Sequence, residues 1–225
     1  MNLDIKNRNV YVVSDIHNDA SGFKELLDKI SFSKDDLLII NGDIFDRGDE
    51  PVELYFEILW HSNIQVVQGN HDIWLAREIL EKYDNQNVGE YISYNSLPLI
   101  EERLVPVDMI RLANWIQEKP YYIKFSLNGV NYQIAHAQTY ETPERIIDKS
   151  KLYMGDAYYE EFIQGMNESP NYISVVGHTP TDNGKIWISP SGRTIRTDCG
   201  NGYKSYNCDV SLGAIRLNDM KEFYV

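Results

Sequence analysis

Residues 37–48 read LLIINGDIFDRG, an apolar run that leads directly into glycines and charged side chains. Leu37 to Ile40 is predicted to be a strand, because a short apolar run bounded by turn residues is typical of the strands of a parallel sheet. The polar segment from Asn41 to Gly48 follows at its carboxyl end. In open α/β sheets, ligands bind beyond the carboxyl ends of the strands. We therefore expect this loop to carry part of a functional site.

Two other segments repeat this pattern of an apolar run that ends in polar side chains. Val10 to Val13 leads into Ser14-Asp15-Ile16-His17, and Ile64 to Val67 leads into Gln68-Gly69-Asn70-His71-Asp72. Helical spacing lies between and after these runs, in stretches that begin near Ser21, Pro51 and Ile73. Alternating strands and helices are typical of an α/β fold with a parallel sheet, in which the strand ends meet at one edge. We therefore expect the three polar loops to lie close together.

The second half of the chain is predicted to be mostly strands. After a helix over residues 107–118, two strands over 121–125 and 130–135 flank Asn128-Gly129, a strong signal for a two-residue hairpin turn. Further strands are predicted over residues 172–176, 185–188, 194–197 and 210–217. Residues 84–106 are irregular in pattern, so we assign them no element and consider a lid or a substrate wall as their role. His136 and His178 each follow a predicted strand, which makes two more metal ligands available.

The bulk composition predicts one folded domain over residues 1–225 and excludes some partners. Hydrophobic residues make up 43% of the chain and charged residues 24%, close to the average of globular proteins. The formal net charge of −13 would repel the backbone of duplex nucleic acid, so we expect no such partner. The chain has neither an apolar run long enough to span a membrane nor an apolar leader, which predicts a cytoplasmic protein without a membrane partner. Reduced thiols at the two cysteines, Cys199 and Cys208, fit that compartment.

Each polar motif has an ordinary structural explanation when it is taken alone. An Asp-x-His segment can be a turn, Gly-Asp is common in loops, and Asn-His-Asp can begin a surface helix. Five such segments, each directly after a predicted strand, are much harder to explain in this way. Together they resemble the phosphoprotein phosphatase family of the calcineurin-like metallophosphoesterases, over about residues 10–200. The matching segments are Asp15-x-His17, Gly42-Asp43-x-x-Asp46-Arg47-Gly48, Gly69-Asn70-His71-Asp72, His136 and Gly177-His178.

The resemblance implies a four-layer α/β/β/α sandwich with two divalent metal ions at the strand ends. By position, Asp43 would bridge the two ions. One ion would bind Asp15, His17 and Asp43, and the other Asp43, Asn70, His136 and His178. A mixed set of imidazoles and carboxylates suits Mn²⁺, Fe or Zn²⁺ better than Ca²⁺, and we take Mn²⁺ as the first choice. Two such ions can activate a water for in-line attack on phosphorus, so no covalent enzyme intermediate is needed.

Further residues match catalytic positions of the family. His71 matches the general acid that protonates the leaving oxygen, and Asp46 matches the carboxylate that orients the imidazole. Arg47 would bind phosphate oxygens through its planar guanidinium. Asp72 is expected to be an N-terminal residue of the following helix rather than a catalytic group.

Three positions depart from the family pattern. Many protein phosphatases of the family carry an arginine directly before Gly-Asn-His, where this chain has Gln68, and we expect Gln68 to face the substrate with one phosphate clamp missing. A second family arginine, between the last two histidine motifs, has Arg145 as its nearest counterpart and Lys151 as another candidate. Asn18 stands where many members have glycine, and asparagine tolerates a positive φ. The missing arginines put protein-phosphatase activity in question and leave the metal site intact.

These residues predict a metal-dependent phosphoesterase that acts on phosphomonoesters, first of all phosphoserine and phosphothreonine in proteins. The alternative is a symmetrical dinucleoside tetraphosphate hydrolase, a branch that also has Gly-Asn-His-Asp and that residues 112–120, with Asn114-Trp115, resemble. A phosphodiesterase ranks third, because His178-Thr179-Pro180 lacks the second histidine of the usual Gly-His-x-His. A non-catalytic binding module ranks last, since every expected ligand is present. The expected substrate is therefore a phosphorylated protein or a small phosphoester.

Overall fold

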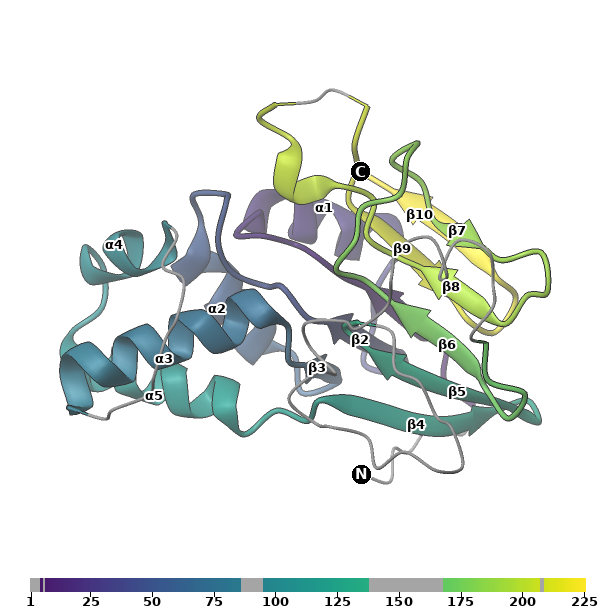
Figure 1. Ribbon diagram of the computed structural model, residues 1–225, viewed down its shortest axis with the longest axis horizontal. Helices are drawn as coiled ribbons and strands as arrows, with labels where there is room; N and C mark the ends of the chain where they lie inside the picture. The colour runs from purple at the N-terminus through teal and green to yellow at the C-terminus, as the bar shows by residue number, and fades with distance from the viewer. Residues whose placement is uncertain (1–4, 6, 86–94, 138–167, 207–208) are drawn as a thin grey trace.

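Two five-stranded mixed sheets form the centre of the computed structural model, which describes residues 5, 7–85, 95–137, 168–206 and 209–225 (Figure 1). The strand order is β10-β9-β1-β2-β3 in the first sheet and β4-β5-β6-β8-β7 in the second. The first sheet contains β1 (Val10–Val13), β2 (Leu37–Asn41), β3 (Ile64–Val67), β9 (Gly213–Arg216) and β10 (Lys221–Tyr224). The second contains β4 (Tyr122–Leu127), β5 (Val130–Ala135), β6 (Ile173–Val176), β7 (Trp187–Ile188) and β8 (Thr194–Arg196). Within them, β1, β2 and β3 run parallel, as do β5, β6 and β8.

The strands of the first sheet face two hydrophobic cores. Val10 and Val12 of β1 belong to the core between the two sheets, together with Ile134 of β5. Tyr11 and Val13 belong to the core between the first sheet and the helices. This alternation follows from the two-residue period of a strand, and burial on both faces explains why the strand reads as a continuous apolar run.

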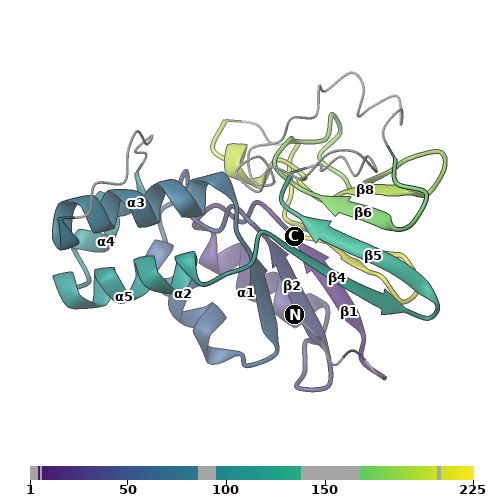
Figure 2. The same cartoon turned by 60° about the horizontal axis from the view of Figure 1, so that its bottom comes forward.

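Five helices in the described part of the chain pack on the outer face of the first sheet (Figures 1 and 2). They are α1 (Ala20–Lys29), α2 (Pro51–Trp60), α3 (Asn70–Asp84), α4 (Ser96–Glu101) and α5 (Pro106–Gln117). The helix layer and the two sheets are three of the four layers expected for an α/β/β/α sandwich. They confirm the predicted α/β sandwich. Among the described residues, no helix has both the length and the apolar character that crossing a membrane requires.

The start of α1 differs from the prediction. The helix begins before Ser21, and Asp19 caps it, because a carboxylate oxygen of Asp19 accepts a hydrogen bond from the Gly22 N–H at 2.8 Å. The hydroxyl of Ser21 instead donates to Glu50 at 2.8 Å. The helix therefore begins at Ala20 and its cap lies next to the loop that follows β1.

The start of α3 also lies earlier than predicted. The helix begins at Asn70, three residues before Ile73, so Asn70, His71 and Asp72 form its first turn. Asp72 accepts a hydrogen bond from the Gly69 N–H at 2.8 Å, which confirms its expected position at a helix N-terminus. The helical start explains how three consecutive polar residues can be buried beside the end of β3.

The second half agrees with the predicted elements in outline. The hairpin between β4 and β5 is confirmed, with positive φ at both Asn128 and Gly129. The strands predicted over residues 185–188 and 210–217 are shorter, and the edge strand β10 was not predicted because its sequence, Lys-Glu-Phe-Tyr, begins with two charged residues. Helix α4 lies in the stretch that received no assignment.

Asn41 joins the two sheets at the end of β2. Its side-chain amide donates to the carbonyl of Ala135 at 3.0 Å and to that of Val175 at 3.3 Å, and both bonds are buried. The carboxyl ends of β2, β5 and β6 therefore meet at one place. His136 and His178, which follow β5 and β6, are brought to the loops of the first sheet in this way.

Candidate metal centre

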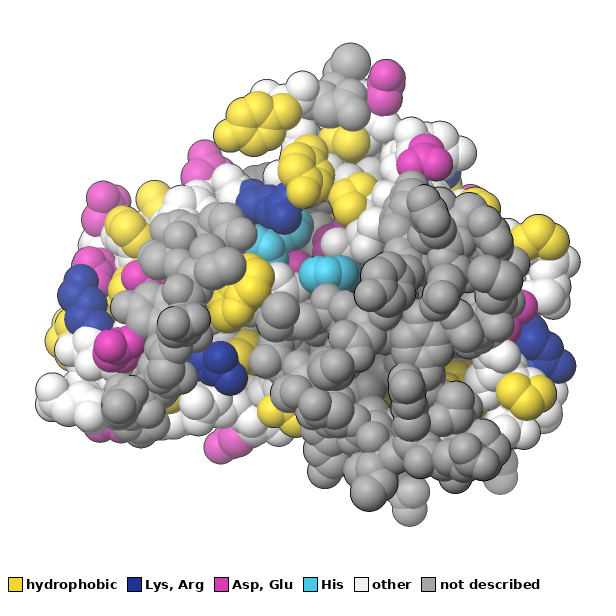
Figure 3. All heavy atoms as spheres, viewed as in Figure 1, with side chains coloured by type: hydrophobic (Ala, Val, Ile, Leu, Met, Phe, Trp, Pro, Cys, Tyr) yellow, Lys and Arg dark blue, Asp and Glu magenta, His cyan; other side chains and the backbone are white. Residues whose placement is uncertain are grey.

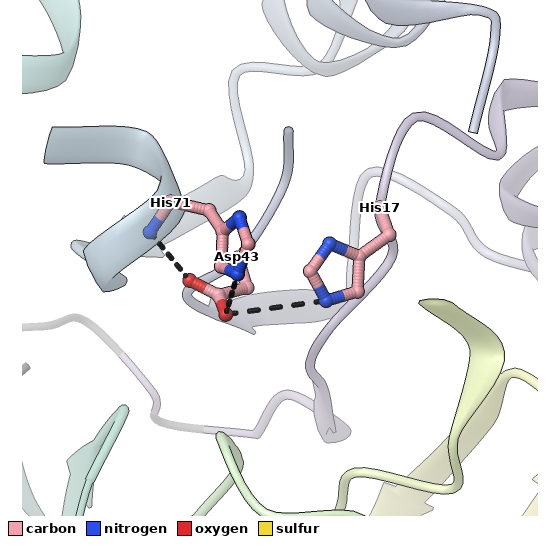
Figure 4. A group of neighbouring side chains, drawn as sticks. All are labelled: His17, Asp43 and His71. Carbon is pink, nitrogen blue, oxygen red and sulfur yellow. Dashed lines mark hydrogen bonds and ion pairs between the residues drawn. The ribbon is translucent and has the colours of Figure 1, made fainter. Parts of the chain in front are cut away.

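Asp43 lies at the centre of a cluster of buried imidazoles (Figure 4). Its Oδ2 atom is 4.0 Å from Nε2 of His17, 3.9 Å from Nε2 of His71 and 3.2 Å from Nε2 of His136. Two groups of possible ligand atoms share this carboxylate, each with its atoms within 4.8 Å of one another. They are His17, Asp43 and His71, and Asp43, His136 and His178. A carboxylate shared by two groups is the arrangement that a bridging ligand of two ions requires.

Asn70 and Asp15 complete the cluster on the side of the second sheet. The Oδ1 atom of Asn70 lies 3.2 Å from Nε2 of His136 and 3.0 Å from Nδ1 of His178. The Asp15 carboxylate accepts a hydrogen bond from the backbone N–H of His178 at 3.1 Å. The structure thus brings together all six residues that the sequence proposed as ligands.

Backbone carbonyls orient two of the imidazoles. Nδ1 of His17 lies 2.9 Å from the carbonyl of Phe45, and Nδ1 of His136 lies 2.8 Å from that of Asn41. When Nδ1 donates to the carbonyl, the lone pair of Nε2 points toward Asp43, which is the tautomer that a metal ligand needs. Figure 3 shows histidine side chains in a recess of this face, next to a basic side chain.

The backbone of the ligand loops is strained at several residues. Asp15, His17, Asp43 and His178 have φ values of 53°, 53°, 50° and 70°, in the left-handed region that side chains other than glycine rarely adopt. Such conformations cost of order 1–3 kcal/mol each and cluster at functional sites, where the surrounding structure holds them. These four residues all belong to the expected ligand set, and Asn18, Asp46 and Arg47 in the same loops also have positive φ.

Close packing of glycines shapes the same loops. A Cβ atom at Gly42, whose φ is 78°, would lie 2.5 Å from Nδ1 of His136, and one at Gly177 would lie 2.3 Å from a carboxylate oxygen of Asp15. Any side chain at these positions would displace an expected ligand. The glycines of the Gly-Asp and Gly-His motifs are therefore required by the site itself.

The buried carboxylates of the site favour the binding of a cation. Burial raises the pKa of the Asp15 carboxyl, and the neighbouring Asp198 and Asp43 raise it further. Burial likewise raises the pKa of Asp198 to about 6. Three buried carboxyl groups that repel one another are costly without a cation, since a buried charge needs a partner or a metal ion.

The buried imidazoles differ in their affinity for a proton. Burial lowers the pKa of His17 to about 3 and that of His178 to about 4. Burial also lowers the pKa of His136, but the adjacent Asp43 carboxylate outweighs it and raises this pKa to about 10. His17 and His178 are therefore neutral at pH 7, as ligands must be, whereas a metal ion that binds His136 would have to displace its proton. Oxygen and nitrogen donors in this mixture fit divalent transition-metal ions.

His71 and Asp46 form a buried pair beside the cluster. Nδ1 of His71 lies 2.9 Å from Oδ2 of Asp46, and the backbone N–H of His71 donates to Oδ1 of Asp43 at 3.1 Å. The side chains of His71 and Asp46 are 3% and 4% exposed, so solvent does not compete for the bond between them. Asp46 therefore fixes the orientation of His71, with Nε2 directed toward the expected metals.

The N-terminus of α4 holds the Asp46–Gly48 loop, a contact that no sequence pattern predicted. Ser96 Oγ accepts a hydrogen bond from the Asp46 N–H at 2.7 Å, and the Ser96 N–H donates to Oδ1 of Asp46 at 3.2 Å. Asn95 accepts from the Arg47 N–H at 2.6 Å and donates to the Gly48 carbonyl at 2.7 Å. Both residues lie in the unassigned stretch 84–106, so part of that stretch supports the site.

Arg47 is partly buried and stacks on Tyr203, with 4.3 Å between the guanidinium carbon and the ring centroid. Tyr203 ends a short 3₁₀ helix, η2 (Asn201–Tyr203), in which a Cβ atom at Gly202 would lie 2.3 Å from the His17 ring. The segment after Cys199 therefore lies beside the site, as expected. Cys199 itself packs in the core between the sheets.

The structure does not favour the substrate-binding role expected for Gln68. Its side chain is 4% exposed, and its amide donates to the carbonyl of Ile116 in α5 at 2.7 Å. Its backbone N–H donates to the carbonyl of Pro120 at 3.0 Å. Gln68 thus joins the end of β3 to the end of α5. Arg145, Lys151 and Cys208 lie outside the described residues.

Known proteins share both the sequence pattern and the fold. A family model described as calcineurin-like phosphoesterase matches residues 8–206. The symmetrical bis(5'-nucleosyl)-tetraphosphatase of Buchnera aphidicola is 34% identical over 110 residues, 48% of this chain and 36% of that protein. A candidate serine/threonine-protein phosphatase of Encephalitozoon cuniculi is 25% identical over 166 residues, 70% of this chain and 32% of that protein. The matched regions thus span about a third of these relatives.

A solved structure resembles almost the whole chain. The crystal structure of a candidate diadenosine tetraphosphatase superposes with a TM-score of 0.73 at 19% identity. The match covers 99% of this chain and 95% of that one. At 19% identity this similarity shows that the two proteins have the same fold, over nearly the whole length of both chains.

Proposed function

Because this chain belongs to the calcineurin-like phosphoesterase family, we propose that it hydrolyses dinucleoside tetraphosphates symmetrically into two nucleoside diphosphates at a two-metal centre. The observation that carries this proposal is the similarity to relatives named symmetrical bis(5'-nucleosyl)-tetraphosphatase, in Buchnera, Haemophilus and Neisseria. The phosphoserine and phosphothreonine phosphatase activity that we expected first has weaker support, because the relative with that name is 25% identical.

The ligand cluster supports the metal-dependent part of the proposal. One ion would be held by Asp15, His17 and Asp43, and the other by Asp43, Asn70, His136 and His178, with Mn²⁺ as the expected metal and Fe or Zn²⁺ as alternatives. When bound, the two ions supply Lewis-acid activation of the attacking water and neutralise charge on the phosphate in the transition state. The Asp43 carboxylate would be the ligand that both ions have in common, since it belongs to both groups of possible ligand atoms.

The reaction breaks the central bridge of the tetraphosphate. The oxygen of a water bonds to one of the two inner phosphorus atoms, and the bond from that phosphorus to the central bridging oxygen breaks in line. The bridging oxygen leaves with the electron pair on the second nucleoside diphosphate. Arg47 is positioned to donate to the phosphate oxygens during this step, since its stacking on Tyr203 fixes the guanidinium plane.

His71 is the group that we propose for proton delivery to the leaving oxygen. Its bond to Asp46 holds Nδ1, so Nε2 is the nitrogen left to act as general acid. A phosphate leaving group needs less help from a proton than a serine alkoxide does, because its second pKa is about 6. His71 should therefore matter less for a dinucleoside tetraphosphate than for an alkyl phosphate.

Product analysis tests the proposal directly. The protein is incubated with Mn²⁺ and, in separate reactions, with diadenosine tetraphosphate, a phosphoserine peptide and bis-p-nitrophenyl phosphate. We expect ADP as the sole nucleotide product and the highest kcat/KM on diadenosine tetraphosphate. A higher kcat/KM on the phosphopeptide, or formation of ATP and AMP, would show that the proposal is wrong.

A further inference from the structure

A cavity of about 560 Å³ opens beside the metal centre. Of the six expected metal ligands, only His17 lines the cavity, and Arg47 lies in its wall as well. The cavity therefore lies to one side of the ligand cluster. The charged side chains of Asp19, Asp49, Glu50 and Lys204 also line it. Pockets for small ligands commonly measure about 300–1,000 Å³, so this one is large enough for part of a nucleotide.

Two basic side chains line the cavity, although the net charge of the whole chain is −13. Arg47 lies at the end next to the metal centre, and Lys204 lies on the segment that follows η2. Arg47 stacks on Tyr203, and Lys204 follows Tyr203 directly in the chain, so the two basic side chains belong to the same wall of the cavity. Two basic side chains match a chain of phosphates better than they match a single phosphomonoester.

Lys204 is available for such a contact. Its Nζ atom lies 3.1 Å from a carboxylate oxygen of Asp19, and its side chain is 56% exposed. An exposed ion pair of this kind contributes little to stability, about 0–1 kcal/mol, so the ammonium group can turn to a phosphate at small cost. Asp19 meanwhile keeps its hydrogen bonds to Gly22 and to Asn201.

The remaining lining suits a sugar rather than another anion. The carboxylates of Asp19, Asp49 and Glu50 and the amides of Asn95 and Asn201 line the cavity, and carboxylates accept hydrogen bonds from ribose hydroxyls. Further phosphate charge would be repelled there. The cavity therefore has a cationic part for phosphates and a polar, partly acidic part for a nucleoside.

We propose that this cavity binds the leaving nucleoside diphosphate half of the substrate, with Lys204 as a specificity-determining residue that contacts its phosphates; the identity of this ligand rests on the proposed function. We expect a small ester such as p-nitrophenyl phosphate, which has a single phosphate, to bind at the centre without a contact to Lys204. Removing the ammonium group should then affect the two substrates differently.

Lys204→Gln tests the role of the ammonium group, with Lys24→Gln as its matched control. Lys24 is 52% exposed, pairs with Glu57 at 3.6 Å and does not line the cavity. We expect Lys204→Gln to raise KM for diadenosine tetraphosphate roughly 5- to 10-fold more than KM for p-nitrophenyl phosphate. Lys24→Gln should change neither KM more than about two-fold, because Lys24 does not line the cavity and solvent and salt screen an exposed charge. Equal changes in both substrates for Lys204→Gln would overturn the proposal.

Product inhibition tests nucleotide binding in the cavity independently of whether the protein cleaves diadenosine tetraphosphate. ADP and orthophosphate are each titrated against p-nitrophenyl phosphate hydrolysis in the wild type and in Lys204→Gln. We expect the variant to weaken inhibition by ADP at least five-fold more than inhibition by orthophosphate. If the wild type does not cleave diadenosine tetraphosphate but this difference is seen, the proposed function fails and the cavity stands as a nucleotide site. If ADP inhibition is the same in both proteins, the cavity proposal fails.

A cavity-filling variant tests the space itself. Ser205 lines the cavity and is exposed, so Ser205→Trp adds bulk there without replacing a buried group. We expect this variant to lower kcat/KM on diadenosine tetraphosphate at least five-fold more than on p-nitrophenyl phosphate. An equal effect on both substrates would count against nucleotide binding at this place.

Discussion

Replacement of Ser96 by alanine should lower the stability of the protein. The Ser96 Oγ atom accepts hydrogen bonds from the Asp46 N–H at 2.7 Å and from the Asn18 side-chain amide at 3.0 Å, and the residue is fully buried. Alanine leaves the Asp46 N–H and one N–H of the Asn18 amide unpaired, although this amide keeps its 3.2 Å bond to the Gly48 carbonyl, and an unpaired buried donor costs about 1–3 kcal/mol. Because the loop can partly relax, we expect the free energy of unfolding to fall by about 2–4 kcal/mol. This corresponds to a drop of roughly 4–16 °C in Tm for a chain of this length.

The same substitution should also lower turnover. Asp46 and Arg47 have φ values of 71° and 72°, a conformation that costs a non-glycine residue about 1–2 kcal/mol. Without the Ser96 hydroxyl the loop can relax and move both side chains away from the phosphate. A displacement of about 1 Å can cost 10²-fold in rate. We therefore expect kcat on diadenosine tetraphosphate to fall roughly 10- to 100-fold at a temperature where the variant is fully folded.

Ser189→Ala is the matched control for Ser96→Ala. Ser189 is also buried, and its hydroxyl accepts the backbone N–H groups of Arg193 at 3.2 Å and Thr194 at 3.1 Å in the turn between β7 and β8. We expect a comparable fall in Tm and a kcat within about two-fold of wild type, because unpaired donors at this turn touch no proposed catalytic group. Thermal unfolding and steady-state kinetics of both variants decide the matter. A lowered Tm with unchanged kcat for Ser96→Ala would refute the positioning role of Ser96.

Three further substitutions probe other parts of the site. His71→Asn should lower kcat by roughly 10² to 10⁴ on phosphoserine and by less on diadenosine tetraphosphate, and equal losses on the two substrates would indicate a positioning role instead of general acid catalysis. Gln68→Arg should reduce the free energy of unfolding in urea by about 2–4 kcal/mol, because it breaks the 2.7 Å bond to Ile116 and buries a charge. A lower KM with an unchanged urea midpoint would instead place residue 68 at the phosphate. Gly177→Ala should weaken Mn²⁺ binding roughly 10- to 100-fold in calorimetric titration, because its Cβ would lie 2.3 Å from a carboxylate oxygen of Asp15. An unchanged affinity would remove Asp15 from the ligand set.

The convergence of the ligand loops could be predicted from the sequence because it follows from strand direction. The carboxyl ends of β1, β2 and β3 share one edge in any parallel sheet, so Asp15, Asp43 and Asn70 had to lie near one another. The positions of His136 and His178 needed more than this rule. Their approach depends on the second sheet, which the buried Asn41 amide joins to the first.

The supporting residues could not be predicted in the same way. Ser96 contacts Asp46 across 50 residues of sequence, and helix α4, with 6 residues, is too short for a hydrophobic period to place it. Gln68 follows a strand whose end was predicted correctly, but the direction of its side chain depends on the carbonyl of Ile116 in α5. Tertiary contacts of this kind leave no local pattern. The family resemblance likewise did not decide between phosphoprotein and dinucleoside tetraphosphate as substrate.

The metal content of the wild type and of Asp43→Asn tests the two-metal centre most directly. Elemental analysis after reconstitution with Mn²⁺ is combined with turnover of diadenosine tetraphosphate in the presence and absence of a chelator. We predict two ions per wild-type chain, activity that chelation abolishes and Mn²⁺ restores, and at most one ion with little turnover in Asp43→Asn, because the variant loses the charge that both cations share. Two retained ions and near wild-type turnover in Asp43→Asn, or full wild-type activity in excess chelator, would contradict this account.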